Sequence, residues 1–280
     1  MERIASTGAK GGVGKSTFAI LLAFKLSSQG KKVVLCDCDV ECPNDHLILG
    51  KELDEKTSET IYQEYPILDK EKCIKCGICS NTCREHAIFW VKGKHPAFIY
   101  DLCTGCGACW LVCPQKAIKP KKEKAGESFV NKVKENFWLV TGRSKAGISE
   151  TGPIVTEVKK RAMKIAEKEK ANVLIFDTAP GTHCSVIQAL LGCDKAYAVT
   201  EPTPLGAHDL SLILELLQKI KVPAEIVLNK ADVGKKDLIE TIAKKFDVKI
   251  SVEIPYSEKL VDAYCNKKLE NVVNLLRWKK

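Results

Sequence analysis

A glycine-rich segment near the start of the chain has the composition and spacing of a phosphate-binding loop. It comprises Ala9, Lys10, Gly11, Gly12, Val13, Gly14, Lys15, Ser16 and Thr17. Glycines let backbone N–H groups surround an anion, and the N-terminus of a following helix adds partial positive charge. In such a P-loop, Lys15 reaches the β- and γ-phosphates of a nucleotide and the Ser16 hydroxyl ligates Mg²⁺. Ala9 departs from the G-x-x-x-x-G-K-S/T pattern, and a glycine-rich helix cap without a ligand is the alternative.

Eight of the fourteen cysteines fall into two runs with the same spacing, C-x₂-C-x₂-C-x₃-C. This spacing is typical of bacterial ferredoxins with two [4Fe–4S] clusters, in which the fourth cysteine of each run ligates the other cluster. The pattern predicts one cluster on Cys73, Cys76, Cys79 and Cys113 and a second on Cys103, Cys106, Cys109 and Cys83. Arg84 replaces the proline that usually follows the first run, whereas Pro114 follows the second. Two zinc sites are the alternative, although zinc frameworks usually pair two C-x-x-C knuckles across a longer loop.

The additional lysine in the glycine-rich loop, Lys10, indicates a family. Lys-Gly-Gly-Val-Gly-Lys-Ser resembles the deviant P-loop of the MinD/ParA group, which includes the nitrogenase iron protein and iron–sulfur scaffold ATPases. In that family the early lysine reaches across a dimer to the nucleotide of the partner subunit. The resemblance therefore implies an ATP-bound homodimer closed by Lys10. A solvent-facing loop lysine is the alternative.

Further segments resemble the same family. Asp37-Cys38-Asp39 matches switch I, so Asp39 would orient the attacking water beside Mg²⁺ and Asp37 would support it. The segment 177–181, Asp-Thr-Ala-Pro-Gly, resembles a Walker B carboxylate running into switch II. Asp177 would hold the metal through water, and Gly181 would sense the γ-phosphate. The segment 201–204, Glu-Pro-Thr-Pro, also resembles the sequence of this family.

The sequence is compatible with two identities of the bound nucleobase, guanine and adenine. Asn229-Lys230-Ala231-Asp232 fits N-K-x-D, in which the aspartate pairs with guanine. The resemblance instead implies that Asn229 and the loop at Pro255 hold adenine. ATP is favoured, because the family match extends over nearly all of the chain outside the cysteine-rich segment whereas N-K-x-D is only four residues long.

The elements expected to position these residues alternate between strand and helix. Strands are predicted at 2–7, 33–36, 137–140, 173–176, 196–200, 225–228 and 250–254, and helices at 16–28, 153–170, 206–220 and 235–246. Such alternation predicts a doubly wound α/β fold with a mainly parallel sheet covered on both faces. The predicted domains are 1–64 and 123–280, which together form the P-loop domain, and an inserted ferredoxin-like module at 65–122.

Composition narrows the functional classes. The formal charge is +9, but Lys and Glu alternate along the helical stretches as on solvated faces, so nucleic-acid binding is not expected. The densest basic run, 116–124, is interpreted as a solvated linker, with docking of an acidic redox partner as the alternative. The most apolar stretch, 18–26, is too short to cross a membrane, and no leader is recognisable, so a cytoplasmic protein is expected.

Three functions are compatible with this sequence. The favoured one couples Mg-ATP binding and hydrolysis in a homodimer to electron transfer through two [4Fe–4S] clusters to a redox partner. The second is a maturation factor that transfers iron–sulfur clusters or metal to a client. The third is a positioning ATPase that binds a membrane through the apolar stripe at 269–278, although docking of that stripe on the sheet is the commoner use.

One cysteine outside the two runs has a counterpart in the same family. Cys184 follows Asp177 by seven residues, where the nitrogenase iron protein, by resemblance, has a cysteine that binds its dimer-bridging cluster. A structural thiol is the alternative.

Overall fold

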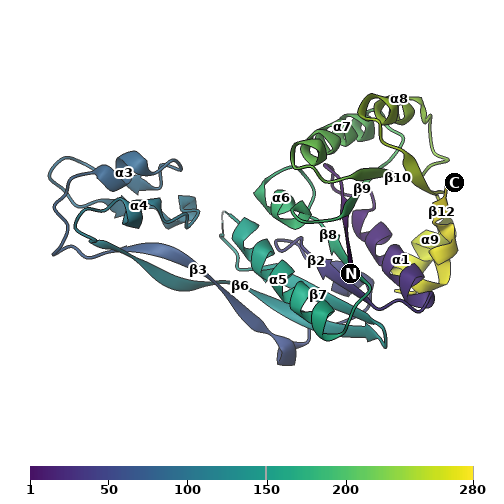
Figure 1. Ribbon diagram of the computed structural model, residues 1–280, viewed down its shortest axis with the longest axis horizontal. Helices are drawn as coiled ribbons and strands as arrows, with labels where there is room; N and C mark the ends of the chain where they lie inside the picture. Colours follow the sequence, from purple (N-terminus) through teal and green to yellow (C-terminus); the bar gives the residue numbers. More distant parts are fainter. Residues whose placement is uncertain (149, 280) are drawn as a thin grey trace.

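The computed structural model describes residues 1–148 and 150–279 and consists of an α/β body with a long projecting arm (Figure 1). The strands are β1 (Glu2–Thr7), β2 (Val33–Asp37), β3 (Glu59–Leu68), β4 (Ile88–Phe89), β5 (Ala97–Phe98), β6 (Ile118–Lys134), β7 (Phe137–Ser144), β8 (Val173–Asp177), β9 (Lys195–Thr200), β10 (Ala224–Asn229), β11 (Ile250–Ile254) and β12 (Arg277–Trp278). The α-helices are α1 (Lys15–Ser28), α2 (Asp45–Ile48), α3 (Ile78–Thr82), α4 (Ala108–Leu111), α5 (Gly152–Lys168), α6 (Cys184–Leu190), α7 (Pro204–Lys219), α8 (Asp237–Phe246) and α9 (Glu258–Cys265). Single 3₁₀ segments are η1 (Glu55–Thr57), η2 (Tyr100–Leu102) and η3 (Leu269–Leu275).

One large sheet organises the body. In the described part of the chain its order is β12-β11-β10-β9-β1-β8-β2-β7-β6-β3. The strands from β11 to β7 run parallel, whereas β12, β6 and β3 run antiparallel to their neighbours. The central strands β2 and β8 are apolar and wholly buried, as expected where helices cover both faces. The predicted doubly wound, mainly parallel fold is confirmed.

Two helical layers enclose the sheet. Helices α1 and α9 pack on one face, with Phe18 and Leu35 in their core. Helices α5 to α8 pack on the other, with Val158 and Leu210 in their core. The apolar stripe near the C-terminus forms η3 and β12 and buries Leu269 against the α1 layer, so it docks on the body. No helix in residues 1–148 and 150–279 has the length and apolarity needed to cross a membrane.

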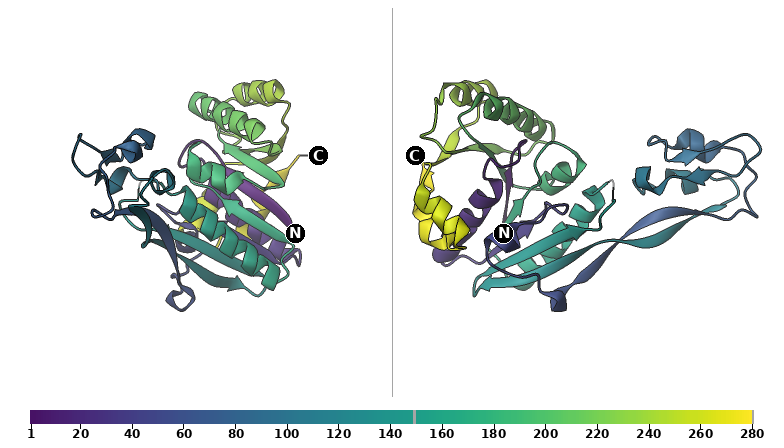
Figure 2. Two further views of the ribbon diagram at one scale, coloured as in Figure 1. Left: turned by 60° about the vertical axis from the view of Figure 1, so that its left-hand side comes forward. Right: turned by 180° about the vertical axis from the view of Figure 1, so that it is seen from behind.

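The arm is a two-stranded ribbon of β3 and β6 that carries the cysteine-rich segment away from the body (Figures 1 and 2). Strand β6 pairs with β3 from Ile118 to Ser128 and with β7 from Gly126 onward, so the ribbon grows directly out of the main sheet. In the basic run 116–124, predicted to be a solvated linker, residues 119–124 are exposed, but they belong to strand β6 of the ribbon. The predicted boundaries at 64/65 and 122/123 fall inside β3 and β6.

The root of the ribbon is held by Arg161 of α5, whose guanidinium is largely buried. It donates hydrogen bonds to the carbonyl and hydroxyl of Ser128 on β6 and to the carbonyl of Thr57 before β3. A register shift opposite Ile61 marks a bulge beside Gly126, where the ribbon leaves the body. Bulges increase local twist and bend a strand pair, which accounts for the change of direction there.

Candidate functional site

The glycine-rich loop lies between β1 and α1 at the carboxyl end of the parallel strands, where ligands bind in open α/β sheets. Gly14 precedes α1 with φ 96°, a left-handed conformation that glycine adopts without strain. The Asn229 side chain donates from Nδ2 to the Val13 carbonyl at 2.9 Å. A Cβ on Gly14 would lie 2.5 Å from that Nδ2, so a larger residue would displace Asn229.

Lys15 is almost wholly buried at the start of α1. Its Nζ donates to the Lys10 carbonyl at 3.1 Å, so the ammonium curls back over the loop. Burial lowers the pKa of Lys15, while the charges of Asp177 and Asp39 act in the opposite direction. An ammonium that is bound to one loop carbonyl and lies within the electrostatic influence of two carboxylates is positioned to neutralise a bound phosphate.

Asp177 ends β8 with its carboxylate buried next to the loop. Burial raises the pKa of Asp177 to about 7, although the Ser16 hydroxyl and Lys15 both act to lower it. Its Oδ1 has no hydrogen-bond partner among the residues that the structure describes. A buried carboxylate oxygen without a partner, beside a P-loop serine, fits a site for a hydrated Mg²⁺.

The two switch I aspartates have different surroundings. Asp37 is buried, and its carboxylate accepts hydrogen bonds from the backbone N–H groups of Asp39, Asn44 and Asp45 at 3.0–3.1 Å. Asp39 is less buried and accepts one hydrogen bond from the Cys42 N–H at 3.3 Å. Burial raises the pKa of Asp39, while the Lys15 charge lowers it. Asp37 therefore shapes the loop that presents Asp39 to the site.

Asp45 is a fourth acidic group at this site, and it was not predicted from the sequence. It is fully buried, and neither carboxylate oxygen has a hydrogen-bond partner in the described part of the chain. Burial raises its pKa, with Asp37 and Asp177 adding to the effect. Its sequence signal is only an acidic residue at the start of a four-residue helix, which is indistinguishable from a helix cap.

The remaining predicted nucleotide residues lie around the same edge. Gly181 has φ 102° and donates from its N–H to the Gly8 carbonyl at 3.3 Å, which links switch II to the loop. The loop containing Pro255 is tied to the Asn229 strand end, because the Tyr256 N–H donates to Asp232 at 2.6 Å. In an N-K-x-D site Asp232 would pair with guanine, but here its carboxylate accepts this backbone hydrogen bond.

Lys10 lies partly exposed on the glycine-rich loop. Its Nζ is 3.3 Å from Oε1 of Glu201, which follows β9 in the same chain. The second oxygen of that carboxylate is 3.0 Å from Nζ of Lys230. The side chain expected to reach a partner subunit is therefore paired within its own subunit here.

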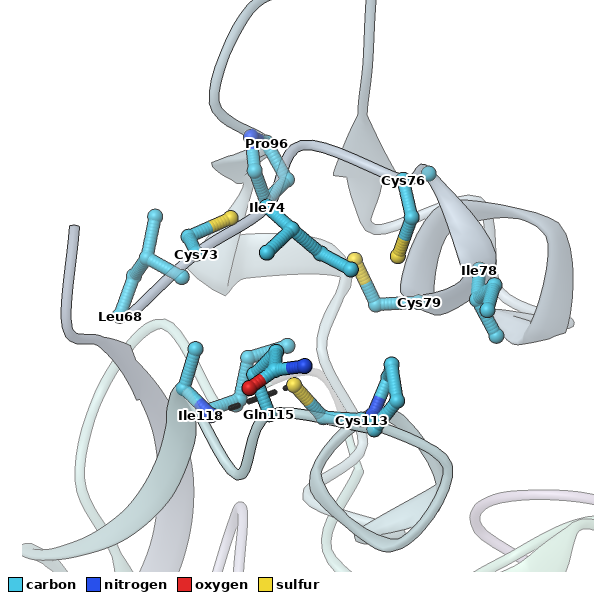
Figure 3. A pocket seen from close by; sticks show the side chains of 13 residues that line it. Leu68, Cys73, Ile74, Cys76, Ile78, Cys79, Pro96, Cys113, Gln115 and Ile118 are labelled. Atoms are coloured by element: carbon cyan, nitrogen blue, oxygen red, sulfur yellow. Dashed lines mark hydrogen bonds between the residues drawn. The ribbon is translucent and has the colours of Figure 1, made fainter. Parts of the chain in front are cut away.

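The predicted cluster ligands line two cavities in the head of the arm. Cys73, Cys76, Cys79 and Cys113 border the first, and Figure 3 shows their sulfur atoms pointing toward a common space. The Cys113 Sγ also accepts a hydrogen bond from the Ala117 N–H at 3.2 Å. Cys83, Cys103, Cys106 and Cys109 border the second cavity. Each cavity therefore contains three cysteines of one run and the fourth cysteine of the other.

Four cysteines border each cavity, a donor set that holds either a [4Fe–4S] cluster or a structural zinc ion. Burial raises the pKa of the Cys109 thiol to about 12, so an isolated thiolate there is strongly disfavoured and needs cationic ligation. In residues 1–148 and 150–279, no three His, Cys, Asp or Glu side chains converge closely enough to hold one metal ion. The crossed arrangement, with the fourth cysteine of each run in the other cavity, is that of ferredoxins with two [4Fe–4S] clusters.

The glycine-rich loop follows the first strand of a parallel sheet, and acidic residues lie at the ends of β2 and β8. This arrangement is that of a P-loop nucleotide-binding protein. The CbiA family, described as the CobQ/CobB/MinD/ParA nucleotide binding domain, matches residues 4–270. The chain belongs to this family and is a P-loop ATPase of the MinD/ParA type, with a ferredoxin-like 4Fe–4S region. The predicted preference for ATP over GTP agrees with this membership.

Particular relatives cover different parts of the chain. A protein of Methanocaldococcus jannaschii, MJ0579, is 35% identical over 267 residues, which is 95% of this chain and 90% of that protein. The ketoisovalerate oxidoreductase subunit VorD of Pyrococcus furiosus is 38% identical over 100 residues, or 35% of this chain and 92% of that subunit. The fold resembles the septum site-determining protein MinD of Pyrococcus horikoshii complexed with Mg-ADP, with a TM-score of 0.57 and 17% identity over 98% of this chain and 93% of that one.

Proposed function

We propose that this ATPase couples Mg-ATP binding and hydrolysis to electron transfer through two [4Fe–4S] clusters to a redox partner. The observation that carries the proposal is the continuous hydrogen-bonded path from switch I to the arm. The Ser144 N–H donates to the Val40 carbonyl at 2.7 Å, and Val40 directly follows Asp39. Ser144 pairs with Gly126, at the root of the ribbon that carries both cavities. Movement of switch I therefore has a hydrogen-bonded route to the root of the arm that carries the clusters.

We assign the nucleotide chemistry to the residues at the carboxyl edge of the sheet. The backbone of residues 11–17 and Lys15 would hold the phosphates, and Ser16 would ligate Mg²⁺ with Asp177 acting through water. Asp39 would orient the attacking water, since Asp37 already anchors the loop that presents it. Bound Mg²⁺ would supply positive charge that stabilises the phosphates during transfer. Asn229 and the Pro255 loop would enclose the adenine.

The nucleotide is proposed to act from within a homodimer. Lys10 would leave its own subunit and contact the phosphates bound by the partner subunit, as the deviant P-loop implies. Closure of two subunits would then change the position of the two switch I loops together. The eight cysteines would hold the clusters with the crossed assignment described above, so electrons would enter and leave at the far end of the arm.

The similarity to VorD supports a redox role over a purely structural one, because that protein is a subunit of an oxidoreductase. The similarity to MinD complexed with Mg-ADP supports the nucleotide assignment through fold alone.

The test follows electrons and iron separately during turnover. Reduced, cluster-loaded protein is mixed with Mg-ATP and either an oxidised ferredoxin, which can accept electrons, or an apo-ferredoxin, which can accept iron. Electron transfer to the oxidised ferredoxin should be faster with ATP in the wild type but not in Lys15→Ala, while the iron content of the chain stays constant. ATP-dependent movement of iron to the apo-ferredoxin, without electron transfer, would replace this function with cluster maturation.

A further inference from the structure

Glu201 forms an ion-paired cluster at the edge of the nucleotide site. Its side chain is only 12% exposed, and each carboxylate oxygen faces one lysine, Lys10 at 3.3 Å and Lys230 at 3.0 Å. Burial acts to raise the pKa of Glu201, but hydrogen bonds and charge from the two lysines outweigh it, and the pKa is lowered. The carboxylate is therefore ionised and attracts both cations at neutral pH.

Two lysines on one carboxylate allow one of them to leave. A buried carboxylate that loses its only cation is strongly destabilised, because its charge is left without compensation. Here Lys230 would remain on Oε2 after Lys10 had departed from Oε1. Lys10 can also move its side chain without unfolding the loop, since its carbonyl stays bound to Lys15 Nζ at 3.1 Å.

We propose that Glu201 is a positioning residue that holds Lys10 against its own subunit and thereby raises the threshold for ATP-dependent dimer closure. The proposal rests on the function proposed above, in which Lys10 acts across the dimer. The phosphates of the partner's nucleotide compete with the Glu201 carboxylate for the Lys10 ammonium. Lys230, the lysine of the N-K-x-D sequence, keeps Glu201 neutralised after the exchange.

The first experiment measures the dimer dissociation constant by analytical ultracentrifugation, using full-length, cluster-loaded protein and a non-hydrolysable ATP analogue with Mg²⁺. Glu201→Gln keeps the shape of the side chain and removes its charge. Each dimer contains two such ion pairs, so the dissociation constant should fall about 2- to 30-fold. Glu225→Gln is the matched control, because Glu225 also contacts two lysines, both at 3.7 Å, but lies at the opposite end of its strand from Asn229. It should dimerise like the wild type.

A second experiment measures the contact between Lys10 and Glu201 in the monomer. Acetylation of Lys10 in nucleotide-free monomer, followed by mass spectrometry, should be severalfold faster in Glu201→Gln than in the wild type or in Glu225→Gln. Equal labelling rates of Lys10 in all three proteins would overturn the proposal. An unchanged or weaker dimer in Glu201→Gln would also overturn it, provided that the variant binds Mg-ADP normally.

The double variant separates this inference from the proposed function. If Lys10→Ala prevents dimer formation and Glu201→Gln does not restore it, the gain in Glu201→Gln acts through Lys10 and the proposal is supported. If Lys10→Ala dimerises like the wild type, Lys10 has no role across the dimer. The proposed function then loses its dimer contact, and the inference fails with it. If only the effect of Glu201→Gln is absent, the inference alone fails.

Discussion

Asp177→Asn should stabilise the nucleotide-free protein while it impairs magnesium binding. Burial raises the pKa of Asp177 from 3.8 to about 7, so the folded protein binds this proton more tightly than the unfolded chain. The resulting stability is present in full at pH below 3.8 and is lost as the pH rises toward about 7. Each pH unit in this window costs about 1.4 kcal/mol, which amounts to about 4 kcal/mol at neutral pH. Asparagine has no charge to bury and avoids this cost.

The assay is anaerobic urea unfolding followed by the circular dichroism of the helices. At about pH 7.5 the variant should gain up to about 4 kcal/mol in unfolding free energy, and between about pH 5.5 and pH 7 its decline with pH should be shallower by about 1.4 kcal/mol per unit. Mg-ADP at about 100 times its dissociation constant should add about 2.7 kcal/mol to the wild type and much less to the variant.

Asp194→Asn provides a control of opposite sign. Asp194 is exposed, and its hydrogen bonds with Arg3 lower its pKa, so this variant should lose a little stability and keep the neutral pH dependence of the wild type. The same pH dependence in Asp177→Asn as in the wild type, or a loss of stability at neutral pH, would refute the assignment of Asp177 as a buried, costly carboxylate.

Three further predictions test other parts of the molecule. Cys113→Ser should lower the iron content from about eight to about four atoms per chain and remove the cluster held by the first run, whereas Cys83→Ser should remove the cluster held by the second. Iron analysis and electron paramagnetic resonance show which cluster is lost. Loss of the cluster held by the mutated run itself would contradict the crossed ligation. Arg161→Ala should lower the unfolding free energy by about 3 kcal/mol, because the carbonyls of Ser128 and Thr57 at the root of the ribbon lose their hydrogen-bond donor. The exposed Lys160→Ala is the control, and the same urea midpoint in both variants would contradict this prediction. Lys15→Ala should lose nucleotide binding, whereas Asp39→Ala should bind but not hydrolyse; equal ATPase rates in both and in the wild type would remove the site.

The parts of the fold that the sequence predicted are those whose signals are local. Strands such as β8 are apolar on both faces, and the glycine loop and cysteine runs have fixed spacings. Strand β6 of the ribbon was not predicted because its residues 119–124 are exposed on both faces. Lys121 and Lys122, on opposite faces of β6, are both exposed, so no apolar alternation identifies a strand. The predicted boundary at 122/123 falls inside β6 for the same reason.

The parts of the site that escaped prediction depend on long-range packing. Asp45 resembles a helix cap in sequence, and only the fold buries it beside Asp37 and Asp177. The contact between Lys10 and Glu201 joins residues 191 positions apart, and two familiar motifs meet there without any local signal. A motif predicts which groups take part in the chemistry, whereas the partners of those groups are decided by strand order.

The central claim is that nucleotide binding controls the clusters, and the midpoint potential of each cluster tests it most directly. We would measure these potentials with and without a non-hydrolysable Mg-ATP analogue, in the wild type and in Lys10→Ala. A coupling of the usual size would shift at least one potential by about 40–130 mV in the wild type, and the shift should be absent in Lys10→Ala. Identical potentials under all four conditions would contradict nucleotide-controlled electron transfer.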